Sequence, residues 1–412
     1  MLASGPGTAA EPSSGPMRAV FGMTGLVRFG FGLTLAVFAA YVTGHASGLS
    51  TTEVGTVGLV SGLAPIGEFG TVLGSGILAD RRGRFPVLAV GMAGAAVALL
   101  LISFSRDPWV IGPVNFGFGI CSGAILAASL AVVGDRAGLG QRGLEMGRFD
   151  AANLVGWVGG FATGYAFLGA LPNGDLPWVM RGAAVVLALG LLYAFSAFRR
   201  ERVGPPTVPL DLRRLFAAIG RRDVLLVTVP WFAIYLLLGT VFVFLGTASG
   251  SLGVSPFVLA GAIGGGGLLL VLTQPAYGRL ADRYGRTRLM VVGASGFVGL
   301  LAGAAYLATY GVSYPVIGGM AVCALAGLAY GPAALAALAD LSHRISRATT
   351  MAVYTLTISL GMWVGLAVST GLYTTFGATG LDLFFGGIAA VLGGLTALRV
   401  WDVRTGRAQV GV

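Results

Sequence analysis

Two charged residues stand inside long apolar runs of this 412-residue chain. Arg28 lies within the run 19–43, and Glu68 lies within the run 54–79. A charge at the depth of a membrane is unfavourable, so such residues usually serve a substrate, an ion or a proton. A guanidinium could hold an anionic group, and a carboxylate could take up and release a proton. These two side chains are therefore the first candidates for chemistry.

Arg28 and Glu68 are predicted to form an ion pair near the middle of a membrane. Counted from the end of each run that faces the same side of the membrane, they lie roughly 13 and 16 Å deep, at about 1.5 Å of rise per residue. Consecutive helices joined by a short loop are usually neighbours. Two roles stay open at this point. Either the pair breaks and reforms during transport, or it is static and only joins two helices, although buried pairs often add little net stability.

A short charged phrase occurs twice, as "GILADRRGRFP" and as "GRLADRYGRTR", with 202 positions between the two aspartates. Each copy lies in the short loop between two apolar runs. The first glycine would allow a neighbouring helix to approach closely, and the second would permit the positive φ of a tight turn. The aspartate could accept hydrogen bonds at the start of another helix, and the arginines could pair with carboxylates or helix-end carbonyls. The members are Gly76, Asp80, Arg81, Gly83 and Arg84, then Gly278, Asp282, Arg283, Gly285 and Arg286.

Twelve apolar stretches are long enough to cross a bilayer as helices, since about 20 residues suffice. A second pair of loops, which aligns Met146 with Met351 and Gly156 with Gly361, repeats at an offset of 205. The sequence thus predicts an all-α integral membrane protein of two six-helix bundles related by a pseudo-twofold axis. The expected spans are 19–43, 54–79, 86–105, 109–133, 149–171, 178–198, 224–246, 255–278, 289–309, 314–338, 351–374 and 382–400.

The remaining segments are short and polar. Residues 1–18 are expected to be a disordered tail, because their small, polar and Pro-rich composition cannot form a core. Residues 199–223 are expected to be a cytoplasmic linker between a bundle at 19–198 and a bundle at 224–400, and residues 401–412 a cytoplasmic tail. Asp150 and Asn153 are expected to begin the span 149–171, with Asp150 as a helix cap.

Composition excludes several classes of protein. Charged residues make up 10% of the chain, whereas soluble proteins have about 25%. The net charge is +10, but no soluble face is available for a nucleic acid. Cys121 and Cys323 lie in apolar runs, and no metal or disulfide spacing accompanies them. The sequence shows no nucleotide-binding loop and no acid–base cluster, so we expect no enzymatic activity, no cofactor and no metal.

The placement of arginine predicts the orientation. With the N-terminus in the cytoplasm, 23 of the 26 basic residues, all of them arginine, fall on the cytoplasmic side. Basic residues accumulate in cytoplasmic loops. Both termini are therefore expected in the cytoplasm of a multi-pass protein of the cell membrane.

The doubled phrase, the twelve spans and the central linker resemble the major facilitator superfamily, over nearly the whole chain. The phrase matches that family's loop signature, a glycine, three residues, Asp-Arg, any residue and Gly-Arg. The resemblance implies a cytoplasmic latch, with Asp80 facing the start of the span 351–374 near Thr349–Ala352. It also implies a central cavity between the halves, where substrate sites of such folds lie. The candidate lining residues are Arg28, Phe31, Thr34, Phe38, Asn115, Ser122, Trp231, Tyr235, Phe242, Tyr330, Pro332, Thr357 and Trp363.

The expected lining is aromatic and sparsely charged, which favours a lipophilic or weakly polar solute over a sugar. At two positions the sequence departs from the pattern of proton-antiport drug exporters, and both departures stand against that function. Asn115 occupies the place where many such exporters carry an arginine, and the span 149–171 has no proline after its glycines.

The favoured function is a secondary transporter that works by alternating access, as a monomer, with a small-molecule substrate and with coupling to protons through Glu68 left open. Efflux is preferred to uptake. The alternatives are a uniporter or symporter for an organic anion bound at Arg28, and a membrane sensor that kept the fold without transporting.

Overall fold

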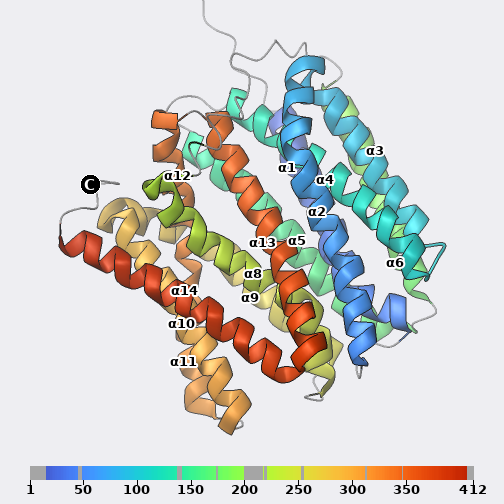
Figure 1. Ribbon diagram of the computed structural model, residues 1–412. Coiled ribbons are helices and arrows are strands. Elements are labelled where there is room, and N and C mark those ends of the chain that lie inside the picture. Colours follow the sequence, from blue (N-terminus) through green and yellow to red (C-terminus); the bar gives the residue numbers. More distant parts are fainter. Residues whose placement is uncertain are drawn as a thin grey trace, which may run out of the picture.

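The computed structural model describes residues 15–44, 49–136, 142–172, 175–198, 217, 220–251, 255–310, 313–345 and 347–405, and these form helices and no strands. The N-terminal half contains α1 (Gly15–Thr43), α2 (Thr51–Arg82), α3 (Arg84–Ile102), α4 (Pro108–Arg136), α5 (Arg142–Ala170) and α6 (Leu176–Phe198). The C-terminal half contains α8 (Arg222–Ser251), α9 (Pro256–Tyr284), α10 (Arg286–Tyr310), α11 (Tyr314–Leu328), α12 (Tyr330–Ile345), α13 (Arg347–Phe376) and α14 (Ala378–Arg404) (Figure 1).

Eleven stretches within the described residues are long and apolar enough to cross a membrane. The expected span 314–338 is one of them, although its helix is interrupted at Ala329, just before Tyr330-Gly331-Pro332. Of the twelve expected spans, the one that is not among these eleven is α5. Its glycines and the polar Asp150 and Asn153 make it less hydrophobic. Its 29 residues still suffice to span a bilayer.

The two halves share a packing pattern. In the first half α1 packs against α5 and α6, α2 against α4, and α3 against α4 and α6. In the second half α8 packs against α13 and α14, α9 against α12, and α10 against α11, α12 and α14. These are the same neighbours once α11 and α12 are counted as one span. The fold is therefore two six-helix bundles related by pseudo-twofold symmetry, as the sequence predicted.

The ends of α2 and α9 show the duplication at the level of single residues. Ser50 caps α2 in a capping box with Glu53, and Ser255 caps α9 by accepting from the Val258 N–H. Both helices end at a glycine with positive φ, +96° at Gly83 and +93° at Gly285. The predicted tight turns are thus confirmed.

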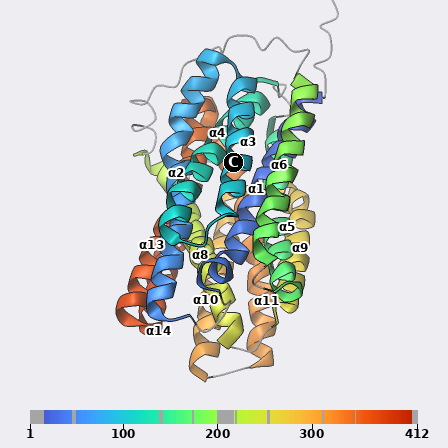
Figure 2. The ribbon, with the colours of Figure 1, turned by 90° about the vertical axis from the view of Figure 1, so that its right-hand side faces the viewer.

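The halves meet along two helix pairs, α2 with α13 and α5 with α9 (Figures 1 and 2). We call the end of the bundle that carries the Gly83 and Gly285 turns the Gly83 face, and the other end the opposite face. Towards the opposite face α2 and α13 are in contact, because a Cβ added to Gly55 would lie 3.3 Å from Thr374 Cγ2 and one added to Gly62 would lie 3.6 Å from Trp363 Cδ1. Gly58 packs directly against Thr370.

Among the described residues, the glycines of α2 that lie nearer the Gly83 face do not contact α13. A Cβ added to Gly70, Gly74 or Gly76 would meet no atom within 4 Å, and the same holds for Gly278 on α9. No described residue approaches Gly76 or Gly278 closely in this conformation. α2 and α13 lie close together at the opposite face and diverge towards the Gly83 face (Figure 1).

Several expected boundaries shift. α1 begins at Gly15, inside the segment expected to be a tail, and α14 continues to Arg404. α5 begins at Arg142, so Asp150 lies inside the helix and the expected capping role is wrong. Residues 1–14 and 406–412 and most of the expected linker, 199–216 and 218–219, lie outside the described residues.

Candidate substrate and coupling site

Arg28 and Glu68 form the ion pair that the sequence predicted. The distance from Arg28 Nη1 to Glu68 Oε2 is 2.7 Å, and the distance from Nη2 to Oε1 is 2.9 Å. The two side chains are only 2% and 3% exposed. A bidentate contact of this kind is the strong form of an arginine–carboxylate interaction.

Three further side chains complete the hydrogen bonds of the pair. Arg28 Nε donates to Asn153 Oδ1 over 2.8 Å. The Ser122 hydroxyl donates to Glu68 Oε2, and the Ser359 hydroxyl donates to Oε1, each over 2.8 Å. Charges this deeply buried are tolerated when such partners replace water. The site thus draws on α1, α2, α4 and α5 of the first half and on α13 of the second.

Glycines bring these helices close enough for short side chains to reach. A Cβ added to Gly156 of α5 would lie 2.9 Å from the Arg28 Cβ and would also strike the Gly25 carbonyl of α1. A Cβ added to Gly123 of α4 would lie 2.8 Å from the Glu68 carbonyl oxygen. Small residues permit close backbone packing of membrane helices. Because α5 and α4 lie so close, Asn153 and Ser122 can contact the charged groups directly.

Aromatic rings surround the guanidinium on the side of the first half. The Arg28 Cζ lies 5.9 Å from the centre of the Phe31 ring and 5.7 Å from the centre of the Trp157 ring. These two rings are themselves 4.8 Å apart. Arg28 therefore gains cation–π stabilisation in addition to its ion pair.

The second half carries a row of aromatic residues on α8 and α12. Trp231 and Tyr235 of α8 stack at 6.5 Å, and the Tyr330 ring meets Trp231 edge-on at 6.2 Å. Tyr235 packs beside α13, since a Cβ added to Gly361 would lie 2.7 Å from the Tyr235 Cβ. The Tyr330 hydroxyl donates to the Val227 carbonyl over 2.9 Å, three residues before Pro230 in α8.

The other candidate residues have different surroundings. The Thr34 hydroxyl donates to the Gly30 carbonyl and faces Met180 of α6, inside the first half. Asn115 Nδ2 donates to the Val60 carbonyl over 2.8 Å and so joins α4 to α2. Phe38 is fully buried in the main apolar core. Trp363 is half-buried at the junction with α2, and the Phe242 side chain lies outside the described part of the chain.

Sequence reasoning missed two members of the site. Asn153 was assigned to the start of a helix, and Ser359 was not considered. A signal for both does exist in the internal repeat, because Asn153 stands three residues before Gly156 and Ser359 two residues before Gly361, the two glycines that the repeat aligns. Both are polar residues within apolar runs, on helices that occupy equivalent places in the two halves.

The doubled phrase is arranged differently in its two copies. Arg286 Nη1 donates to the Ala336 carbonyl of α12 over 2.7 Å, which agrees with the expected pairing to a helix carbonyl, and Asp282 lies 4.0 Å from its other nitrogen. Arg84 is buried, whereas Arg81 and Arg283 are exposed. The Asp80 side chain and the side chains near Thr349–Ala352 lie outside the described part, so the expected latch stays a prediction.

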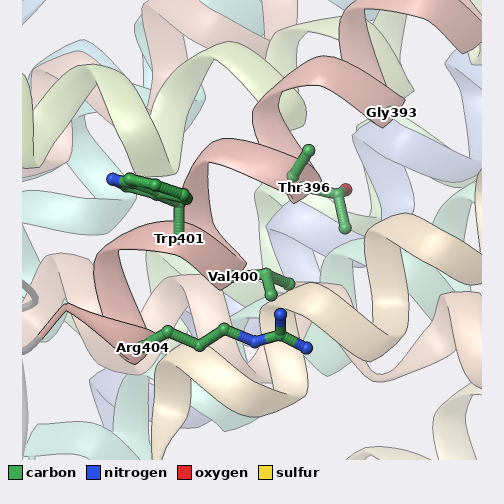
Figure 3. A pocket seen from close by; sticks show the side chains of 6 residues that line it. Gly393, Thr396, Val400, Trp401 and Arg404 are labelled. Carbon is green, nitrogen blue, oxygen red and sulfur yellow. The ribbon is translucent and has the colours of Figure 1, made fainter.

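A shallow groove of about 370 Å³ runs along α14 (Figure 3). It is lined by Gly393, Thr396, Ala397, Val400, Trp401 and Arg404, and it includes none of the residues around Arg28. An exposed tryptophan next to an arginine at a helix end is the usual arrangement where a membrane helix meets the headgroups. We therefore do not assign the groove to the transport site. In the described part of the chain no three His, Cys, Asp or Glu residues are grouped as metal ligands would be.

Comparisons with known proteins agree with this architecture. The family model of the Major Facilitator Superfamily matches residues 20–262 and 232–411. The tetracycline resistance protein, class D, of Salmonella ordonez is 32% identical over 141 residues, so the alignment covers about a third of each chain, 34%.

Solved structures share the fold at low sequence identity. The human organic anion transporter MFSD10 (TETRAN) has a TM-score of 0.70 at 20% identity, covering 95% of this chain and 100% of that one. A POT family transporter in complex with 5-aminolevulinic acid has a TM-score of 0.70 at 15% identity, covering 94% and 95%. The nucleoside transporter NupG has a TM-score of 0.60 at 15% identity, covering 93% and 99%. Because the family model covers well over half of the chain, this protein belongs to the Major Facilitator Superfamily.

Proposed function

We propose that this chain is a secondary transporter that moves a small lipophilic or weakly polar solute out of the cell by alternating access. Although Asn115 stands where many proton-antiport exporters carry an arginine, we propose that this chain is coupled to protons through Glu68. The observation that carries the proposal is the position of Glu68. Its carboxylate pairs with Arg28 inside one half, accepts from Ser359 of the other half, and lies where α2 and α13 begin to separate. A buried, ionisable group at such a junction can link its own protonation to the relative position of the halves.

The proposed orientation follows from arginine. The Gly83 face carries the arginine-rich loops, so it is assigned to the cytoplasm together with both termini. The conformation described here would then be open to the cytoplasm and closed to the outside. A solute would enter between α8 and the first half, next to Trp231 and Tyr235.

The nature of the solute is inferred from the lining and from one relative. The residues around the junction are mainly aromatic, and the charge of Arg28 is neutralised by Glu68 in this conformation. The partial relationship to a tetracycline resistance protein makes tetracycline a suitable first solute. A thermal-shift screen of the purified chain against lipophilic compounds would extend the set, since any ligand of the folded state raises its melting temperature.

The test is uptake into proteoliposomes with an imposed pH gradient. We expect solute flux to follow the gradient in the unaltered chain, and Glu68→Gln to remove that dependence while leaving exchange of labelled for unlabelled solute in place. Ser369→Ala is the matched control, because Ser369 is also a buried serine but its hydroxyl bonds within its own helix. Flux with the same pH dependence in Glu68→Gln would refute coupling through this residue. If the chain instead carried only organic anions, and if this flux were lost in Arg28 variants, the result would favour the alternative function of a uniporter or symporter for an organic anion.

A further inference from the structure

The hydrogen bond between Ser359 and Glu68 crosses from one half of the molecule to the other. Glu68 belongs to α2 and Ser359 to α13, and the bond of 2.8 Å is buried, with residue exposures of 2% and 1%. The Glu68 carboxylate already accepts from Arg28 and Ser122 within its own half. Ser359 is therefore the partner in the second half that can sense the charge on Glu68.

The bond also lies at a defined place along the α2–α13 interface. On the side of the opposite face, Gly55, Gly58 and Gly62 contact Thr374, Thr370 and Trp363. On the side of the Gly83 face, a Cβ added to Gly70, Gly74 or Gly76 would meet no described atom within 4 Å. The Ser359 bond is thus close to the point at which the two helices diverge, where a small change in contact alters the angle between the halves.

We propose that Ser359 is a positioning residue that senses the protonation of Glu68 and holds the opposite face closed while Glu68 is ionised. Hydrogen bonds to a charged acceptor are about twice as strong as those between neutral groups. Protonation of Glu68 weakens both its bond from Ser359 and its pairing with Arg28. The halves are then released, and the opposite face can open.

Charged and titratable groups on every side of Glu68 enter this balance. Arg28 of α1 pairs with the carboxylate. Tyr235 of α8 and Asp150 of α5 are titratable side chains on helices that pack against α1 or α2. Ser122 of α4 and Ser359 of α13 supply neutral hydroxyls. Ser359 is the member of this group that donates to the carboxylate from the second half, so its removal should leave the ion pair intact. This inference rests on the proposed coupling role of Glu68, but it concerns conformation and not flux.

The test measures the distance between Thr52 of α2 and Thr375 of α13, both exposed at the opposite face. Each is replaced by a spin-labelled cysteine in the full chain in lipid nanodiscs, with Cys121 and Cys323 changed to alanine. Double electron–electron resonance then gives the proportions of closed and open molecules at neutral and at low pH, without any solute. We expect Ser359→Ala at neutral pH to lower the closed-to-open ratio about tenfold, as low pH does in the unaltered chain.

Companion variants separate this role from a general loss of stability. Ser359→Thr keeps a hydroxyl and should restore the ratio, and Ser369→Ala should not change it. In a Glu68→Gln background, Ser359→Ala should have little further effect, because the charge that it senses is gone. An unchanged ratio in Ser359→Ala, or a full additional effect in the Glu68→Gln background, would overturn the inference. A pH-independent flux combined with the expected ratios would refute the proposed function alone.

Discussion

At the scale of residues, the Arg28–Glu68 pair makes a prediction about stability. Removing one partner leaves the other charge buried without compensation, which costs about 3–5 kcal/mol. Arg28→Met and Glu68→Leu should therefore each lower the unfolding temperature strongly, and the double variant should recover most of the loss. Thermal unfolding of the purified protein in detergent measures this. Losses that simply add in the double variant would show that the pair is not coupled.

The pair itself was predictable from the sequence, because two charges at similar depth in consecutive membrane helices have few other partners. Of its remaining partners, Ser122 was among the predicted lining residues, whereas Asn153 and Ser359 were not predicted as partners of the pair. Whether Asn153 and Ser359 reach the pair depends on how α5 and α13 are rotated about their axes, and that rotation is fixed by glycine contacts such as Gly156 on Gly25. No short-range pattern in the sequence reports it.

At the scale of elements, the crossing of α1 and α5 depends on Gly156. In Gly156→Ala the new Cβ strikes the Gly25 carbonyl and approaches Arg28, so the two helices must move apart and the Asn153 contact to Arg28 is lost. We expect a destabilisation of about 1–3 kcal/mol, the usual range for overpacking. Gly159→Ala on the same helix is the control, because its Cβ would meet only the Phe29 ring at 3.6 Å. Equal melting temperatures for the two variants would refute this account of the crossing.

The Gly83 turn gives a second prediction for an element. Gly83 has φ +96°, which a residue with a side chain adopts at a cost of about 1–3 kcal/mol. Gly83→Ala should lower the melting temperature, whereas Gly76→Ala, in a helix with open space around it, should leave it unchanged or raise it. Chemical or thermal unfolding compares the two. A larger loss in Gly76→Ala would contradict the open space described there.

Helix number and order were predictable because each span is a long apolar run. The boundaries of the helices were less predictable. The start of α5 was placed too late because its first two turns, from Arg142, are polar and continue beyond the apolar run. The break between α11 and α12 could be suspected from Tyr330-Gly331-Pro332, but a proline within an apolar run is compatible with a bent helix as well as with a broken one.

At the scale of the whole molecule, the two ends of α2 should control opposite conformations. Gly58→Leu adds a side chain where Thr370 packs, so it should prevent closure of the opposite face. A Cβ added to Gly76 would meet no described atom within 4 Å, so Gly76→Leu should disturb this conformation less, while blocking closure at the Gly83 face if α13 approaches there in the other state. Labelling of single cysteines from each side of a sealed vesicle distinguishes the variants. The same labelling pattern in both would contradict a pivot between the two ends.

The duplicated architecture could be predicted from the sequence, since the phrase around Asp80 and Asp282 recurs at a nearly constant offset. The face on which the halves meet could not be predicted from the sequence. A protein that alternates between two conformations encodes both in one sequence, and the free energies of the two differ by only a few kcal/mol. Contacts such as Gly58 on Thr370 are therefore a property of one state and not of the chain as a whole.

The most direct test of the central claim compares distances at both faces in the same protein. One pair of spin labels, at Thr52 and Thr375, reports the opposite face, and a second pair, at the exposed Arg82 and Arg288, reports the Gly83 face. We predict that lowering the pH or adding a transported solute lengthens the first distance and shortens the second in equal proportions of molecules. Distances that stay fixed, or that lengthen together, would contradict alternating access about the Glu68 junction.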